Sequence, residues 1–409
     1  MSTTHIIAGA GLALFAGVAF ANGEAAEPTP TPIKPIEDFS KVYWKNDLRF
    51  ETADKQFVTR IGGRLHFDGI YTDDDDQSTD GWIFRRARLY VSGTVYGNVH
   101  YKAQYDFAGG APAWKDVYMK IDDIVGPFYL QAGQFWMPFG FDVQTSSNNM
   151  IIAEYSITSG LAPERQTGLA VGGDAMDESL FWKVALFNAN SGAANPNGNA
   201  VGGDYQACGR VVYKNDLDEE GSWLQFGGSI SLGAVDDIRF RVRPDVGLGN
   251  RLADTGTIAA TEVMRYGAEV ATVLGPLSAQ AEYIATDIDA VAGSDPGPSS
   301  YYLQVAYLLT GESHSYDKGN NSLGGVTPNS PWQGWGNGTG AFELAARYSS
   351  FDTDLPVSGA MGGELTVLTL GANWYLNSNM RLMLNYAMGD NSDTDVDQDS
   401  YIARFQVTF

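Results

Sequence analysis

The chain has 409 residues, a net charge of −23 and one cysteine. The acidic surplus argues against nucleic-acid binding, because neutralising phosphates needs a basic face. One cysteine excludes an internal disulfide framework and a multi-cysteine zinc site, and the four scattered histidines lead us to expect no metal and no cofactor. Charged residues are only 18% of the chain and glycines number 48, which is unusual for a soluble enzyme.

The N-terminus predicts export. Ile6 to Ala21 are uncharged, and Ala19-Phe20-Ala21 resembles a cleavage site, so residues 1–21 are expected to be a signal peptide. An N-terminal anchor helix is the alternative, since the start lacks Lys and Arg. Residues 22–56 begin with a proline-rich run and are predicted to be an extended periplasmic segment.

From residue 57 onward, apolar and polar residues alternate with the period of a β-strand. In 57–71, Ile61 and Leu65 share one face while Arg60 and Arg64 share the other. In 82–97, the same reading puts Ile83 on the apolar face. Many of these segments exceed the usual length of soluble strands and suit the ~9–11 residues of a tilted membrane strand.

Sixteen segments show this character, and an even number is expected of a bacterial outer-membrane barrel. We therefore predict an all-β fold, a 16-stranded antiparallel transmembrane β-barrel over 57–409. The predicted strands are 57–71, 82–97, 98–108, 113–122, 127–135, 166–174, 179–189, 204–214, 221–235, 262–274, 275–288, 299–310, 340–353, 362–376, 379–390 and 399–409.

The predicted connections alternate between long and short, as expected of outer loops and periplasmic turns. The connection 311–339 is the exception, because it is long but falls on the periplasmic side. The last strand ends in Phe409, which suits recognition by the barrel-assembly machinery. Aromatic girdles are expected near strand ends, with the candidates Trp82, Tyr129, Trp374 and Tyr375.

Several stretches resemble the phosphate-selective porin O and P family. They include GRLHFDG around Arg64, FRRARLYVSGTVYGNVHYKAQYDF (84–107), GQFWMPFGFDVQ (133–144) and LAPERQTGL (161–169). The resemblance implies a homotrimeric outer-membrane channel for phosphate or other small anions. It also implies that outer loops and one long periplasmic turn, here 311–339, fold into the pore.

The sharpest selectivity candidates are Arg239, Arg241 and Arg243. In an extended chain they point one way, while Ile238, Phe240 and Val242 point the other. Arginine suits phosphate because its fork donates to two oxygens and stays charged, and the resemblance places an arginine track in this loop. The alternative is a solvated edge, or pairing with Asp236 and Asp237.

Further cations occupy the polar faces of strands. The candidates for an anion-binding wall are Arg60, Arg64, Arg86, Arg88, Lys102 and Lys120, with Arg165, Lys183, Arg347 and Arg404 weaker. Acids share these faces, namely Asp68, Asp106, Asp116 and Asp122. The alternative is therefore a salt-bridged wall without selectivity.

Acidic residues gather in two predicted outer loops, Asp73–Asp76 and Asp390–Asp399, and in a predicted periplasmic turn with Asp216, Asp218, Glu219 and Glu220. Such outer loops could meet lipopolysaccharide through divalent cations, or simply be solvated. No nucleotide-loop, zinc-protease or dithiol motif occurs, so we expect no catalytic residues. The prediction is an outer-membrane porin for small anions, phosphate first. The alternatives are a weakly selective general porin and a non-conducting structural barrel.

Overall fold

The computed structural model describes residues 41–409 except 75–77, 110–112, 189–204, 218–220, 335, 357–361 and 392. The predicted signal peptide, and Asp75, Asp76, Asp218, Glu219 and Glu220, lie outside these residues. Sixteen antiparallel strands form one barrel, which confirms the predicted fold. They are β3 (Val58–Asp74), β4 (Ser78–Val95), β5 (Val99–Asp106), β6 (Ala113–Val125), β7 (Phe128–Trp136), β8 (Arg165–Ala175), β9 (Leu180–Asn188), β10 (Tyr205–Asp216), β11 (Trp223–Ala234), β15 (Ile258–Leu274), β16 (Leu277–Ala290), β17 (Ser299–Leu308), β20 (Ala341–Asp352), β21 (Glu364–Asn377), β22 (Met380–Asn391) and β23 (Val396–Thr408).

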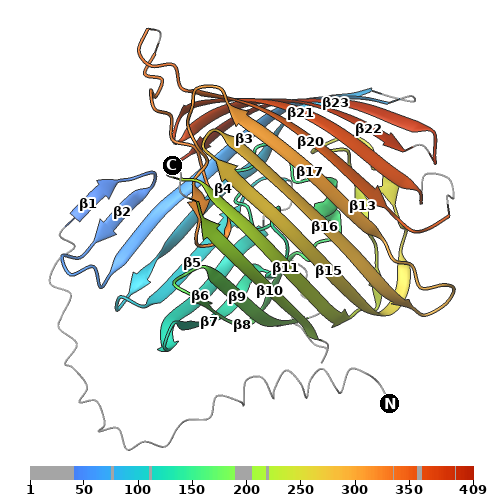
Figure 1. Ribbon diagram of the computed structural model, residues 1–409, viewed down its shortest axis with the longest axis horizontal. Helices are drawn as coiled ribbons and strands as arrows, with labels where there is room; N and C mark the ends of the chain where they lie inside the picture. The colour runs from blue at the N-terminus through green and yellow to red at the C-terminus, as the bar shows by residue number, and fades with distance from the viewer. Residues whose placement is uncertain are drawn as a thin grey trace, which may run out of the picture.

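The barrel closes where β23 pairs with β3, from Gln398 opposite Asp74 to Thr408 opposite Arg64. Closure leaves no unpaired barrel edge for another chain to extend. The two ends of the barrel differ (Figure 1). One, the short-turn end, carries connections as tight as 275–276 and 378–379; the other, the long-loop end, carries 137–164 and 235–257.

Two further strands precede the barrel, in a stretch where the sequence indicated none. β1 (Lys41–Trp44) pairs with β2 (Leu48–Glu51), and β2 pairs with the beginning of β3. Because β23 takes over the pairing with β3 from Arg64 onward, the hairpin extends the wall beyond the short-turn end. No helix among the described residues is long and apolar enough to cross a bilayer.

The outer face of the barrel is apolar, as the alternation predicts. Trp82, Leu384 and Leu344 are among its most exposed residues. Two of the girdle candidates are wrong. Tyr375 is buried and its hydroxyl donates to Glu343, and Tyr129 lines an interior cavity under Lys120, because each has the parity of the inward-facing residues of its strand.

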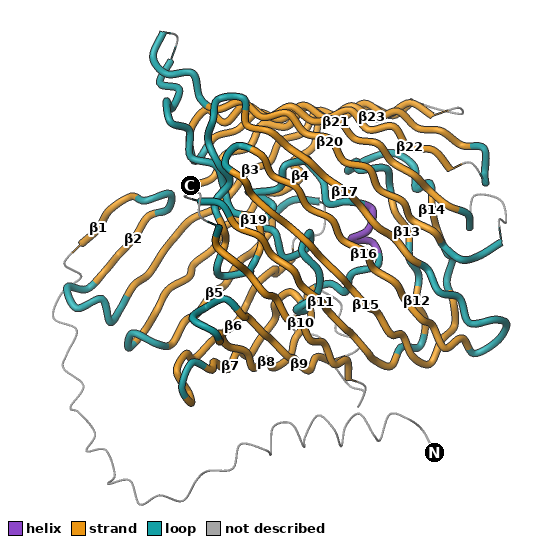
Figure 2. Tube along the Cα trace, in the orientation of Figure 1, coloured by secondary structure: helices purple, strands orange, loops and turns teal. Residues whose placement is uncertain are grey.

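The inside of the barrel is not uniformly polar. Apolar residues of β16 and β21, such as Ile284 and Val367, point inward and pack with Phe139, Phe240 and Val242 of the two long loops. A short 3-10 helix, η1 (Ile157–Gly160), also contacts β16, β17 and β20. Figure 2 draws this helix purple and the loops teal. The loops thus form an apolar core against one side of the barrel, and the remaining lumen lies along the polar side.

Candidate functional site: the lining of the lumen

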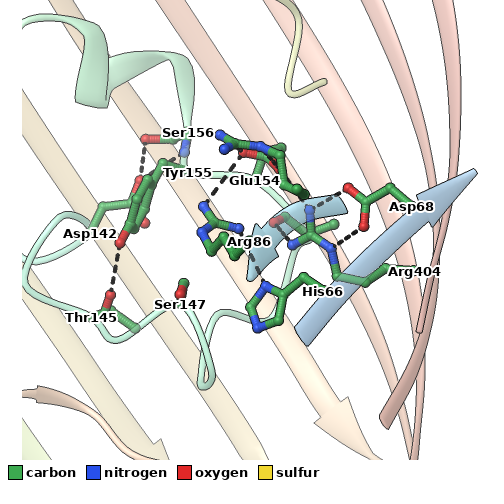
Figure 3. A network of polar contacts seen from close by, with 12 residues as sticks. His66, Asp68, Arg86, Asp142, Thr145, Ser147, Glu154, Tyr155, Ser156 and Arg404 are labelled. Atoms are coloured by element: carbon green, nitrogen blue, oxygen red, sulfur yellow. Dashed lines mark hydrogen bonds and ion pairs between the residues drawn. The ribbon is translucent and has the colours of Figure 1, made fainter. Parts of the chain in front are cut away.

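The long loop 137–164, here called the inner loop, is tied to the wall by the carboxylate of Glu154. Arg85 donates both forks of its guanidinium to Glu154 at 2.8 Å, and Arg404 donates to it at 2.7 Å. Arg404 also binds both oxygens of Asp68 at 2.6 Å and the carbonyl of Ala153. Figure 3 shows this network between the loop and the wall. It fixes the loop inside the barrel.

A β-bulge supplies one of these arginines. The register between β3 and β4 shifts between His66 and Phe67, so that Arg85 is the extra residue of β4. A bulge lets two successive side chains face the same side, and both Arg85 and Arg86 contact Glu154. Strict alternation placed Ile83 on the apolar outer face of its strand. This prediction is wrong, because beyond the bulge Ile83 packs inside the barrel with Ile70 and Val246.

A second set of contacts holds the middle of the inner loop. Arg64 donates to the hydroxyl of Ser147 at 2.7 Å. Within the loop, the backbone N–H and hydroxyl of Ser156 donate to one oxygen of Asp142 at 2.7 and 2.8 Å. Burial raises the pKa of Asp142. For Glu154, burial opposes ionisation, but the guanidiniums of Arg85, Arg86 and Arg404 outweigh it and lower the pKa of that carboxyl.

The three arginines at 239, 241 and 243 show the predicted alternation. Ile238, Phe240 and Val242 are buried in the interior core, whereas Arg239 and Arg241 are exposed and Arg243 is half-buried. The chain is held by β12 (Asp237–Ile238), which pairs with β15, and by β13 (Arg241–Val242), which pairs with β14 (Ala253–Asp254).

The three differ in their partners. Arg239 binds Asp254 with both forks at 2.7 and 2.5 Å, a carboxylate the sequence did not suggest. Arg243 donates to the carbonyl of Gly249 at 2.8 Å. Burial and then the charges of Arg241 and Arg85 lower the pKa of Arg243. Burial, followed by Arg243 and Arg241, likewise lowers the pKa of Arg251. Arg251 also donates to the carbonyl of Arg241 at 3.0 Å, so Arg241, Arg243 and Arg251 are close enough for their charges to act on one another.

Several of the predicted wall cations are neutralised by acids on the same faces. Arg88 binds Asp106 at 2.7 Å, and Lys120 binds Asp122 at 2.9 Å. Lys102 shares Asp116 with Arg165, each at 2.7 Å. Arg86 reaches Glu154 at 3.8 Å. For these residues the salt-bridged alternative describes the geometry.

Four of the nine predicted cations make no ion pair within the described part of the chain: Arg60, Arg64, Arg241 and Arg243. Lys183 is similar, because its ammonium contacts the amide oxygen of Gln131 and the ring of Phe135. Arg347 and Arg404 instead bind the acids Asp245 and Asp68 and act in holding the loops. The sequence analysis missed Arg85 and Arg251. A β-bulge positions Arg85 and the folding of a long loop positions Arg251, and neither a bulge nor a loop fold leaves a periodic signal in the sequence.

The long connection between β17 and β20 enters from the short-turn end. Its strands β18 (Tyr316–Asp317) and β19 (Ser322–Leu323) pair with each other. Arg210 of β10 binds Glu269 and donates to the carbonyls of Asn320 and Asn321. Ser322 donates to the carbonyl of Gln144 in the inner loop at 3.2 Å. Segments from both ends thus meet inside the barrel, which confirms the predicted inward-folded loops.

Two cavities of about 520 and 880 Å³ open between these segments and the wall; the larger lies against β3–β10, and the smaller lies against β3–β6 and also reaches β21–β23. Arg60, Lys102 and Tyr118 line both, and the larger one also reaches Lys120 and Lys183. The lumen is therefore off-centre and lined by cations and their paired acids. Among the described residues, no group of three or more His, Cys, Asp or Glu side chains is placed to hold a metal ion.

A closed, water-accessible barrel with an apolar outer face and loops narrowing its lumen defines the class of outer-membrane porins. Residues 59–409 match the family of phosphate-selective porins O and P, and the chain belongs to that family. It is therefore a porin of a Gram-negative outer membrane, in a family of channels rather than enzymes.

Two related sequences match this chain over most of its length. The chain is 28% identical to Porin O of Pseudomonas aeruginosa over 89% of its own length and 91% of that protein. It is 27% identical to an uncharacterized protein of Caulobacter vibrioides, over 89% and 75% of the two chains.

Solved structures of bacterial proteins, among them a porin, share the fold. OprB of Pseudomonas putida has a TM-score of 0.55 at 10% identity, covering 87% of this chain and 95% of the other. An anion-selective porin from Comamonas acidovorans has a TM-score of 0.51 at 12% identity, covering 86% and 100%. A trimer form of OmpT from Vibrio cholerae has a TM-score of 0.50 at 14% identity, covering 86% and 99%.

Proposed function

We propose that this porin passes small anions by passive diffusion, with phosphate the preferred solute. The observation that carries the proposal is the set of predicted cations without an acidic partner in the described structure: Arg241 and Arg243 at the long-loop end, Arg64 beside the inner loop, and Arg60 in the cavities. A guanidinium whose fork is not occupied by a carboxylate is available to two phosphate oxygens.

The net charge of −23 does not contradict an anion path. Several acids along the lumen are bound to cations, as in the Lys102–Asp116–Arg165 group and the Arg88–Asp106 pair. Selectivity depends on the charges that face the solute rather than on the total.

The test is the zero-current potential of the purified protein in a planar bilayer under a salt gradient, with phosphate added as a blocker. An anion-signed potential and block by phosphate are expected. A cation-signed potential would refute the anion assignment and favour the weakly selective general porin. The absence of any current would favour the structural barrel.

The assembly and its partners are part of the same proposal. A homotrimer is supported by the family and by the likeness to an outer-membrane protein solved in a trimer form. Recognition by the barrel-assembly machinery rests on Phe409 at the end of the seam strand. Contact with lipopolysaccharide rests on acidic outer-loop residues such as Asp393 and Asp395. Size-exclusion chromatography with light scattering tests the first of these.

A further inference from the structure

The connection between β17 and β20 has two parts with different surroundings. The first part enters the barrel and contacts Arg210 and the inner loop, as described above. The second part, residues 328–334 and 336–340, leaves the barrel and is called here the outer arm. In Figure 1 it is the orange loop that stands clear of the strands at the end where the C-terminus lies. The inward part narrows the lumen, and the outer arm has no share in that role.

The outer arm is a closed loop fastened to the end of β21. Thr339 and Gly340 donate their N–H groups to the carbonyl of Ser330 at 3.1 and 2.8 Å, which closes the loop. Trp332 donates its backbone N–H to the carbonyl of Leu376 at 2.7 Å, and the indole N–H of Trp374 donates to the carbonyl of Thr339 at 2.8 Å. These bonds give the arm a defined place on the wall.

The arm adds an aromatic residue to the outer face of the barrel. The ring of Trp332 meets that of Trp374 edge-on at 6.1 Å, and Trp374 stacks on Phe342 at 5.7 Å. Phe342 and Trp374 line an outward-facing apolar furrow of about 510 Å³ together with Leu344, Leu382 and Phe405. Trp332 therefore continues the membrane-facing surface beyond the last residues of the strands.

The composition of the arm differs from that of the rest of the chain. No charged residue lies between Lys318 and Glu343, although the protein carries a net charge of −23. The arm consists of Asn, Gln, Ser, Thr, Gly and Pro around tryptophan. Uncharged hydrogen-bonding groups with an amphipathic indole favour the boundary between lipid headgroups and acyl chains.

We propose that the outer arm is a lipid anchor that lies in the headgroup region of the periplasmic leaflet, with Trp332 inserted beside Trp374. Short turns mark the periplasmic end of outer-membrane barrels, and the arm departs from that end. The partner is the phospholipid surface itself. A neighbouring copy of the chain is the competing occupant; the continuity of Trp332 with the aromatic belt and the lack of charge favour lipid.

The experiment places one fluorophore on the arm. In the full chain with Cys208→Ser, Gln333→Cys is labelled with a nitrobenzoxadiazole dye and reconstituted into phosphatidylethanolamine–phosphatidylglycerol vesicles. Quenching is measured with lipids that carry a spin label near the headgroup, and with aqueous iodide. Ser378→Cys, exposed on the neighbouring turn at the same end, is the matched control, and Leu384→Cys on the lipid-facing wall is the positive reference.

We expect lipid quenching at position 333 at least about twofold stronger than at 378, with weaker quenching by iodide. Adding Trp332→Ala should reduce lipid quenching at 333 without changing channel conductance, because the arm lies outside the lumen. Equal lipid quenching at 333 and 378 would overturn the proposal. Protection from iodide that persists in detergent trimers and disappears in monomers would assign the arm to a neighbouring subunit and overturn it equally. None of these outcomes depends on anion selectivity.

Discussion

Glu154→Gln is the most informative single substitution, because one buried carboxylate serves three guanidiniums. Glu154 is 6% exposed, and the amide keeps the shape but removes the charge that Arg85 and Arg404 bind. Removing one partner of a buried ion pair costs about 3–5 kcal/mol. We therefore expect a lower midpoint of unfolding in guanidinium chloride, and a noisier open channel because the inner loop detaches from the wall.

The same substitution changes selectivity in a predictable direction. Three arginines against Asp68 and Glu154 give this network a formal charge of +1, and without Glu154 the charge is +2. One added charge about 7 Å from a passing anion is worth about 0.6 kcal/mol in water, roughly a threefold gain in anion partitioning. The zero-current potential should shift further toward the anion value.

The matched control is Glu164→Gln, at the exposed end of the same loop. It removes the same charge without touching the guanidinium network, so the free energy of unfolding should stay within about 0.5 kcal/mol of the parent. If Glu154→Gln and Glu164→Gln behaved alike in both assays, the assignment of Glu154 as the attachment point of the inner loop would be wrong.

Three further predictions follow from the geometry. The double variant Arg241→Ala, Arg243→Ala should weaken phosphate block about three- to eightfold, the range expected for removing two charges about 7 Å from the anion with and without salt screening. Lys41→Ala, on β1 outside the barrel, should leave phosphate block unchanged. An equal effect of Lys41→Ala would refute a local role for the two arginines. Phe139→Ala should cost about 3–5 kcal/mol in denaturant unfolding, because Phe139 is fully buried in the interior core. Because the pKa of Glu154 is lowered in the folded protein, its ionised carboxylate stabilises the fold at pH values above its ordinary pKa of 4.5, and this stabilisation is lost as the pH falls below 4.5. Channel noise should therefore rise on acidification in the parent protein and not in Glu154→Gln.

The strands of this porin could be predicted because a membrane barrel imposes period two on nearly every wall residue. The prediction failed where that period is interrupted. Ile83 was misplaced and Arg85 was missed because a bulge adds one residue to β4, and a bulge has no fixed signature. Tyr129 and Tyr375 were misplaced because an aromatic residue near a strand end can face either side.

The selectivity candidates could be proposed from sequence but not ranked. Alternation correctly placed Arg239, Arg241 and Arg243 on one face of an extended segment. Which of them carries an acidic partner depends on Asp254, which reaches Arg239 only through the pairing of β13 with β14. Partners brought together by loop folding are invisible to local patterns.

The seam between β23 and β3 has a consequence for the order of folding. Arg404 belongs to the last strand, yet it binds Asp68 on the first barrel strand and Glu154 on the inner loop. These contacts join distant parts of the chain, and such contacts form late because loop-closure entropy must be overcome first. Arg85 and Arg64 can hold the inner loop before closure, but its contacts with Arg404 form only when β23 docks. An incompletely closed barrel therefore has strands and a lumen but an incompletely fastened constriction.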